Sequence, residues 1–129
     1  MKIESIDHIV LTVKNIEKTI SFYRDVLGME VQTFGKNQDR KGLAFGQQRL
    51  NLQVAGEETH PSAHKPTSGS ADFCLISSTP IAQVADHLQT CGVAIEEGPI
   101  ERGGALGMML SIYFRDPDEN LLEVANYLS

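Results

Sequence analysis

Two residues near opposite ends of the chain carry side chains that could bind a divalent metal. His8 lies in the segment Asp7 to Val13, and Glu123 lies in the segment Asn120 to Asn126. Imidazole nitrogen and carboxylate oxygen are both common ligands of divalent metals. Each segment is an apolar run typical of a strand, so a rigid element would hold each side chain. We therefore ask which elements would position His8 and Glu123 in one site.

The composition excludes several classes of partner. The chain has 129 residues, of which 41% are hydrophobic and 22% charged, and its net charge is −6. This length suits one ordinary domain with its own core. Binding of nucleic acid requires clustered Lys and Arg, which the negative charge disfavours. No apolar segment has the length of a membrane span or the form of an export signal, so we expect a cytoplasmic protein that binds neither membranes nor nucleic acids.

The first half of the sequence predicts a strand, a helix and three further strands. The first strand is expected over residues 6–13 and the helix over residues 16–27. Asn15 suits the N-cap of this helix, and Gly28 suits the left-handed residue that follows its last turn. The three strands that follow are expected at residues 29–34, 42–45 and 49–54.

The second half predicts the same order of elements. Its helix is expected to have Thr79 as N-cap, Pro80 in the first helical position and Gly92 at its end. The segment Asp116 to Asn120, with a proline where its fixed φ is favoured, predicts a turn between the last two strands. The strands of this half are expected at residues 71–76, 94–97, 109–114 and 121–124.

A constant offset relates the first strand and the helix of one half to those of the other. It is 64 positions both from His8 to Asp72 and from Gly28 to Gly92. We therefore predict an α+β fold in which two βαβββ modules form one domain. Module one spans residues 1–56, a linker spans 57–70, and module two spans 71–129. The helices can cover one face of each sheet, so the other face must line a cavity or meet a second sheet.

Strand alternation assigns the candidate site residues to these helix-free faces. Module one contributes His8 together with Asn51 or Gln53, and module two contributes Asp72 and Glu123. An unpaired carboxylate in an apolar strand is costly to bury, so Glu123 needs a metal, a cationic partner or water. There are alternatives to a metal site. His8 could form a hydrogen bond with the backbone, and Glu123 could pair with a neighbouring arginine or be exposed on an open sheet face.

Several other polar or reactive residues need an assignment. The segment 98–107 is expected to be a mobile loop over the cavity or a plain surface turn. Cys74 and Cys91 are expected to be small core residues in a reducing compartment. The linker histidines His60 and His64 are expected to be solvated or to approach the metal or substrate. Three cations could attract an anionic substrate or simply be solvated: Arg40, Lys41 and Arg102.

Three segments resemble the vicinal oxygen chelate superfamily, which includes glyoxalase I, extradiol dioxygenases and bleomycin-resistance proteins. They are residues 7–13, 21–29 and 114–124. The resemblance implies that the paired modules form a half-barrel around a cavity that holds a divalent metal. It also implies a homodimer, in some relatives with sites shared between subunits.

The resemblance implies four metal-binding positions, on the first, fourth, fifth and eighth strands. In this chain they are His8, either Asn51 or Gln53, Asp72, and Glu123. The family usually has glutamate where Asn51 stands and histidine where Asp72 stands. An oxygen-rich set of this kind favours Mg²⁺, Mn²⁺, Fe²⁺ or Ni²⁺ over Zn²⁺.

The function implied by the resemblance is that of a metal-dependent enzyme like glyoxalase I (lactoylglutathione lyase). Its substrate, for which a glutathione adduct is the model, would be chelated through two vicinal oxygens while Glu123 removes a proton. One alternative is a ligand-sequestering protein like the bleomycin-resistance proteins, which use neither metal nor chemistry. Another is an extradiol dioxygenase, although that activity would want a second histidine ligand.

Overall fold

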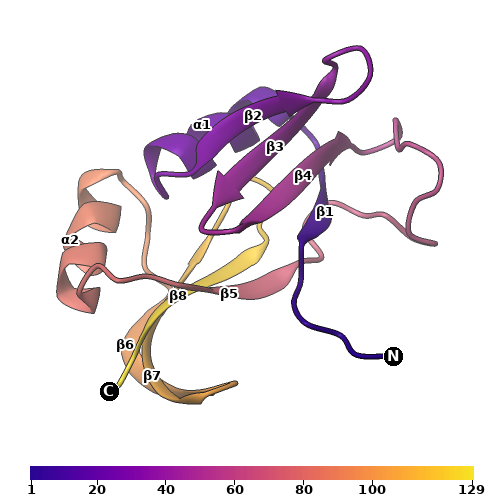
Figure 1. The fold of residues 1–129 in the computed structure, drawn as a ribbon. Coiled ribbons are helices and arrows are strands. Elements are labelled where there is room, and N and C mark those ends of the chain that lie inside the picture. Colours follow the sequence, from indigo (N-terminus) through magenta and orange to yellow (C-terminus); the bar gives the residue numbers. More distant parts are fainter. The chain divides into compact units, whose positions relative to one another are not determined.

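The chain is described over all of its residues, 1–129, by a computed structural model in which it divides into two compact units. Unit 1 spans Met1–Gly69 and unit 2 spans Ser70–Ser129. Each contains one βαβββ module, so the predicted α+β fold is confirmed (Figure 1). The elements are β1 (His8–Val13), α1 (Ile16–Asp25), β2 (Glu30–Phe34), β3 (Arg40–Phe45), β4 (Gln48–Val54), β5 (Asp72–Ile76), α2 (Ile81–Thr90), β6 (Glu97–Gly104), β7 (Gly107–Arg115) and β8 (Leu121–Tyr127).

Unit 1 is a four-stranded sheet with one helix on one face. The strand order is β1-β4-β3-β2, in which β1 runs parallel to β4 and the other neighbours are antiparallel. Helix α1 packs against β2, β3 and β4. Alternate strand residues therefore enter the core beneath the helix. The most buried of the apolar ones are Leu11, Val13, Leu43, Leu50 and Leu52.

The ends of α1 follow the sequence signals. The side chain of Asn15 accepts a hydrogen bond of 3.0 Å from the backbone N–H of Lys18, as an N-cap does. Gly28 has a φ of +70°, which a residue with a Cβ adopts only at a cost. Both predictions for this helix are confirmed, although its regular part stops at Asp25, two residues earlier than expected.

Unit 2 repeats the arrangement with the strand order β5-β8-β7-β6 and with α2 against β6 and β7. The start of α2 corrects one prediction. Pro80, with φ −54° and ψ 138°, is the N-cap residue, and Thr79 makes no capping hydrogen bond. The proline ring disfavours the helical region for the residue before it, so Thr79 stays outside the helix. Gly92 has a φ of +74° after the last turn, as expected.

The glycine-rich segment 98–107 is not a mobile loop. Residues 97–104 form β6, which pairs with β7 along its length, whereas the sequence predicted a strand at 94–97. Glycine is tolerated here because the neighbours approach closely: a Cβ on Gly104 would lie 2.6 Å from the sulfur of Met109. Gly98 has a φ of +108° at an irregularity in the ladder. The glycines therefore accommodate a bulge and a close contact within a hairpin.

The turn between β7 and β8 is held by a buried polar network. The Oδ1 atom of Asp116 accepts hydrogen bonds from the backbone N–H groups of Asp118 and Asn120. The side chain of Asn120 donates to Asp116 Oδ2 at 2.8 Å and accepts from the backbone N–H of Ala71 at 2.9 Å. The predicted hairpin is confirmed, and the network ties it to the start of β5.

The two cysteines do not lie in the core. Cys74 and Cys91 are free thiols, and both are exposed, so their assignment to the core was wrong. Each lies where the alternation of β5 or the end of α2 turns its side chain away from the packed face. Neither helix is long and apolar enough to cross a membrane.

Candidate functional site

The helix-free face of unit 1 carries His8 and Asn51. His8 pairs in register with Arg49, and Asn51 lies two residues further along β4 on the same face. Gln53 lies four residues beyond the partner of His8, or about 13 Å along a strand that rises about 3.3 Å per residue. That separation exceeds what two side chains can span around one ion. The register therefore favours Asn51 over Gln53 as the fourth-strand position.

His8 has the geometry of a potential metal ligand. Its Nδ1 atom lies 2.8 Å from Oδ2 of Asp7, and its side chain is 44% exposed. Such a carboxylate contact orients a histidine and, when the proton is on Nδ1, leaves the Nε2 lone pair free for a metal. His8, oriented by Asp7, is therefore suited to be a metal ligand.

Asn51 is already engaged by a cation. It is 4% exposed, and its Oδ1 atom accepts a hydrogen bond of 2.6 Å from Nε of Arg49. A divalent cation at the same oxygen would be repelled by the guanidinium group, all the more because the site is buried. Gln53 is also buried and donates to the Thr12 hydroxyl at 2.9 Å. Asn51, the fourth-strand residue that the register favours, thus does not fit a metal ligand in this arrangement.

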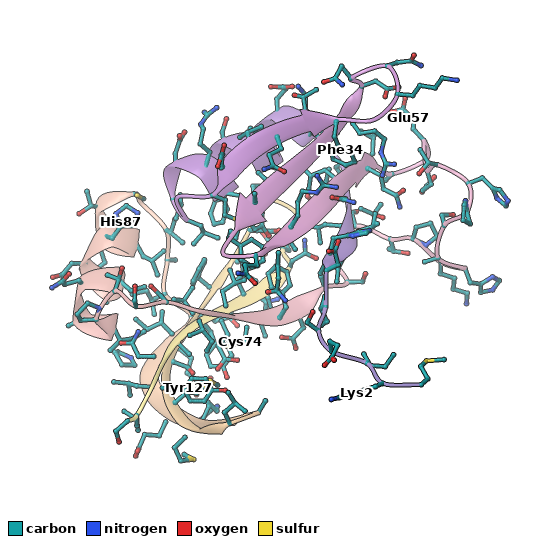
Figure 2. The ribbon with its side chains drawn as sticks, viewed as in Figure 1. Lys2, Phe34, Glu57, Cys74, His87 and Tyr127 are labelled. Atoms are coloured by element: carbon teal, nitrogen blue, oxygen red, sulfur yellow. The ribbon has the colours of Figure 1, made fainter.

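The helix-free face of unit 2 repeats the same register step. Asp72 pairs with Leu121, and Glu123 lies two residues further along β8. The residues directly beside Glu123 are Cys74 on β5 and Tyr113 on β7. Figure 2 labels Cys74 on its strand. Glu123 is therefore the middle member of a row of three polar side chains.

Glu123 is half-buried and held by hydrogen bonding. Its Oε2 atom accepts a bond of 2.6 Å from the hydroxyl of Ser111, a residue that is fully buried. Burial and the neighbouring Glu123 carboxylate raise the pKa of the Cys74 thiol to about 11. The same two causes raise the pKa of the Tyr113 phenol. Both neighbours are consequently protonated at neutral pH.

Asp72 and the linker histidines are exposed. Asp72 is exposed on β5, and neither unit contains three or more histidine, cysteine or carboxylate side chains grouped so that they could hold a metal. His60 and His64 are exposed in a segment without helix or strand. The positions predicted from the sequence thus yield two pairs, one on each unit, with Gln53 and the linker histidines outside them.

The three predicted cations have different environments. Arg102 forms an ion pair with Glu97 at 3.0 Å, and Lys41 donates to the Thr33 hydroxyl at 2.8 Å. Arg40 lies over the ring of Phe34. Sequence reasoning missed four polar or aromatic residues of the two helix-free faces: Phe34, Arg49, Ser111 and Tyr113. The alternation of β4 and β7 was the available signal for Arg49, Ser111 and Tyr113.

The fold, with two βαβββ modules whose helix-free faces carry the polar residues, is that of the glyoxalase class. Residues 5–124 match the family model described as Glyoxalase/Bleomycin resistance protein/Dioxygenase superfamily, and the chain belongs to this superfamily. It is 51% identical over 128 residues to virulence protein STM3117 of Salmonella typhimurium, covering 99% of this chain and 88% of that protein. The crystal structure of STM3117 has a TM-score of 0.96 with this structure, over 99% of this chain and 100% of that one.

Two further relatives are nearly as similar. The glyoxalase domain-containing protein RDO1 of Mycosarcoma maydis is 46% identical over 127 residues, which cover 98% of this chain and 70% of that protein. The integron cassette protein VCH_CASS1 of V. cholerae is 47% identical and has a TM-score of 0.96 over 99% of this chain and 98% of that one. The name of RDO1 agrees with the family assignment.

Proposed function

We propose that the protein is a small-molecule enzyme of the glyoxalase I kind, a lyase or isomerase in which Glu123 is the base. The observation that carries the proposal is the setting of this carboxylate. It is half-buried in an apolar strand, and the Ser111 hydroxyl fixes one of its oxygens at 2.6 Å. The Cys74 thiol and the Tyr113 phenol hydrogen-bond to the same carboxylate, so three neighbours hold it in place on the helix-free face. Family membership and the similarity to a glyoxalase domain-containing protein support the assignment.

The proposed reaction moves one proton between neighbouring carbons. Glu123 removes a proton from a carbon that bears an oxygen and lies next to a carbonyl, and the electron pair passes to the carbonyl oxygen to give an enediolate. The protonated carboxyl then returns the proton to the former carbonyl carbon. The proton of the original hydroxyl passes through solvent to the former carbonyl oxygen, and the oxygen that loses it becomes the new carbonyl. The hydrogen bond from Ser111 keeps the carboxylate in one rotamer through both steps.

A divalent metal such as Ni²⁺, Mn²⁺, Fe²⁺, Mg²⁺ or Zn²⁺ would, when bound, stabilise the negative oxygens of the enediolate. The donor set fits a metal in part. His8 keeps one ring nitrogen outside its contact with Asp7, and Asp72 is an exposed carboxylate. Glu123 is a carboxylate that would have to exchange a neighbour's hydrogen bond for the metal. Asn51 does not fit, because Arg49 occupies its oxygen. The residues that we propose as metal ligands are His8 on unit 1, and Asp72 and Glu123 on unit 2, each taken within its own unit.

The test is turnover of the methylglyoxal–glutathione hemithioacetal by protein stripped of metal and then supplied with each of the five ions in turn. We expect turnover with at least one ion, and its loss in Glu123→Gln. Metal analysis of His8→Ala and Asp72→Ala measures binding separately from activity. Absence of turnover with every ion would overturn the assignment.

A second candidate is a ligand-sequestering protein, and the bond between Arg49 and Asn51 favours it. At this position a guanidinium occupies the oxygen that a metal would use. Such a protein would bind its ligand without metal and without changing it. Purified protein with no stoichiometric metal, whose melting temperature is unchanged by EDTA, would favour this candidate over the enzyme.

A further inference from the structure

Two arginines share one aromatic ring on the helix-free face of unit 1. The guanidinium carbon of Arg49 lies 3.8 Å from the centroid of the Phe34 ring, and that of Arg40 lies 5.2 Å from the same centroid. Phe34 ends β2, Arg40 begins β3 opposite it, and Arg49 lies on β4 (Figure 2 labels Phe34). Three strands therefore bring two positive charges to one place.

A missing side chain allows Arg49 to reach this ring. Gly42 lies on β3 between Gln32 and Asn51 in the register of the sheet. A Cβ on Gly42 would lie 2.7 Å from Cδ of Arg49, closer than carbon atoms in contact can approach. The arginine side chain thus lies across the glycine, from β4 toward β2. Its Nη1 atom there donates to Oε1 of Gln32 at 3.3 Å.

The protein does not neutralise these two charges. Arg49 donates from Nε and Nη1 to the neutral amide oxygens of Asn51 and Gln32. No carboxylate pairs with Arg40 or Arg49. Arg24, Arg102 and Arg115, by contrast, each pair with a carboxylate. Both arginines are half-buried, so they have lost part of the water that would otherwise solvate their charge.

We propose that Arg40 and Arg49, positioned on Phe34, form a binding site for the carboxylate or phosphate group of a small molecule. A guanidinium presents several N–H groups in a planar fork that matches the oxygens of either anion. The contacts of Arg49 with Asn51 and Gln32 fix its orientation before a ligand arrives and leave its Nη2 group to donate. This site lies wholly in unit 1 and stands whether or not Glu123 is a base.

The alternative is a purely structural role, in which Arg40, Arg49 and Phe34 only hold the three strands together by cation–π contact. Such contacts stabilise exposed pairs by about 0.5–1 kcal/mol. A purely structural cluster would bind anions no better than any other positive surface. An anion-binding site predicts saturable anion binding that requires Arg40 and Arg49, whereas a structural cluster predicts neither.

Titration calorimetry at low ionic strength, with inorganic phosphate and succinate as separate probes, tests the proposal. The variants are Arg49→Gln, Arg40→Gln and Gly42→Ala. Gly42→Ala retains every charge while its new Cβ obstructs Arg49. The matched control is Lys41→Gln, which removes one positive charge from the residue next to Arg40. Melting curves confirm that each variant is folded.

We expect saturable binding of at least one probe, weakened about tenfold by each of the three variants and less than twofold by the control. Binding of phosphate alone, or of succinate alone, supports the site and identifies the group that it takes. Equal weakening by Lys41→Gln and Arg49→Gln would mean unspecific attraction and would overturn it. So would the absence of saturable binding for both probes, whatever the activity assay of Glu123 shows.

Discussion

The Nε atom of Arg49 donates a hydrogen bond of 2.6 Å to Oδ1 of Asn51, two residues further along the same strand. Asn51 stands at the place where the superfamily resemblance leads one to expect a metal-binding glutamate. Where the resemblance implies a carboxylate and a metal ion, this chain has the neutral amide of Asn51 and the guanidinium of Arg49. Unit 2 has no equivalent change at Glu123, whose carboxylate is held by a neutral hydroxyl. The two modules share a register and differ in their chemistry.

Replacing Glu123 with glutamine should abolish proton transfer while leaving the fold intact. The amide retains the shape of the side chain and can still accept from Ser111, but it cannot take up a proton. We expect kcat/KM for the hemithioacetal to fall by about 100-fold or more. The control is Glu101→Gln, which neutralises an exposed carboxylate on β6. Equal losses in both variants would contradict a specific role for Glu123.

The thiol of Cys74 should react slowly with iodoacetamide at pH 8. Its pKa of about 11 leaves only a small thiolate fraction at that pH, and the thiolate is the nucleophile. Because the charge of Glu123 helps to raise this pKa, Glu123→Gln should lower it and accelerate alkylation. Rates measured by mass spectrometry in a Cys91→Ser background isolate the one thiol. An unchanged rate would show that Glu123 does not affect Cys74.

Gly42→Ala should destabilise the protein. The new Cβ would lie 2.7 Å from Cδ of Arg49, so the arginine must move and lose its place on Phe34. We expect unfolding in urea to show a loss of about 1–3 kcal/mol. Gly103→Ala is the matched control, since it adds a Cβ in a strand with nothing within 4 Å. Similar losses in both would attribute the effect to strand glycines in general.

Asn120→Ala should be one of the most destabilising single changes outside the apolar core. Asn120 is 1% exposed and joins the carboxylate of Asp116 to the backbone of Ala71. Its removal leaves a buried donor and acceptor unsatisfied, at a cost of about 2–4 kcal/mol in unfolding free energy. Asn37→Ala, in an exposed turn, serves as the control. Catalytic parameters of the folded fraction should not change.

Light scattering should show a homodimer at micromolar concentrations. The family resemblance implies a dimer. In addition, the edge strands β1 and β5 leave apolar side chains exposed, among them Ile9, Val10 and Ile76. Val10→Lys should weaken association because it places a charge on such a strand. A monomer at every concentration tested would refute this expectation.

Periodicity predicted the fold well because the pattern and the local signals agree. Asn15 and Gly28 bound α1 as expected, and the two sheets have the same register step, from His8 to Asn51 and from Asp72 to Glu123. A repeat encodes the topology twice, so the order of elements predicted for one half supports the order predicted for the other.

The failures arose where long-range pairing outweighs local preference. The glycines of segment 98–107 indicate a loop when taken alone, yet β7 pairs with most of this segment and makes it a strand. The bond between Arg49 and Asn51 and the cluster on Phe34 were beyond prediction for a related reason. They depend on how long side chains cross neighbouring strands, which alternation alone does not specify.

The absence of a side chain at position 42 links two positions that are separate in the sequence. Arg49 can lie over β3 only because Gly42 has no Cβ, so the two residues should change together during evolution. A relative with a larger residue at position 42 should lack arginine at position 49, and could then restore a carboxylate at position 51. Positions 42, 49 and 51 would therefore divide the superfamily into two groups. In one group an arginine side chain supplies the positive charge at this position, and in the other a bound metal ion must supply it.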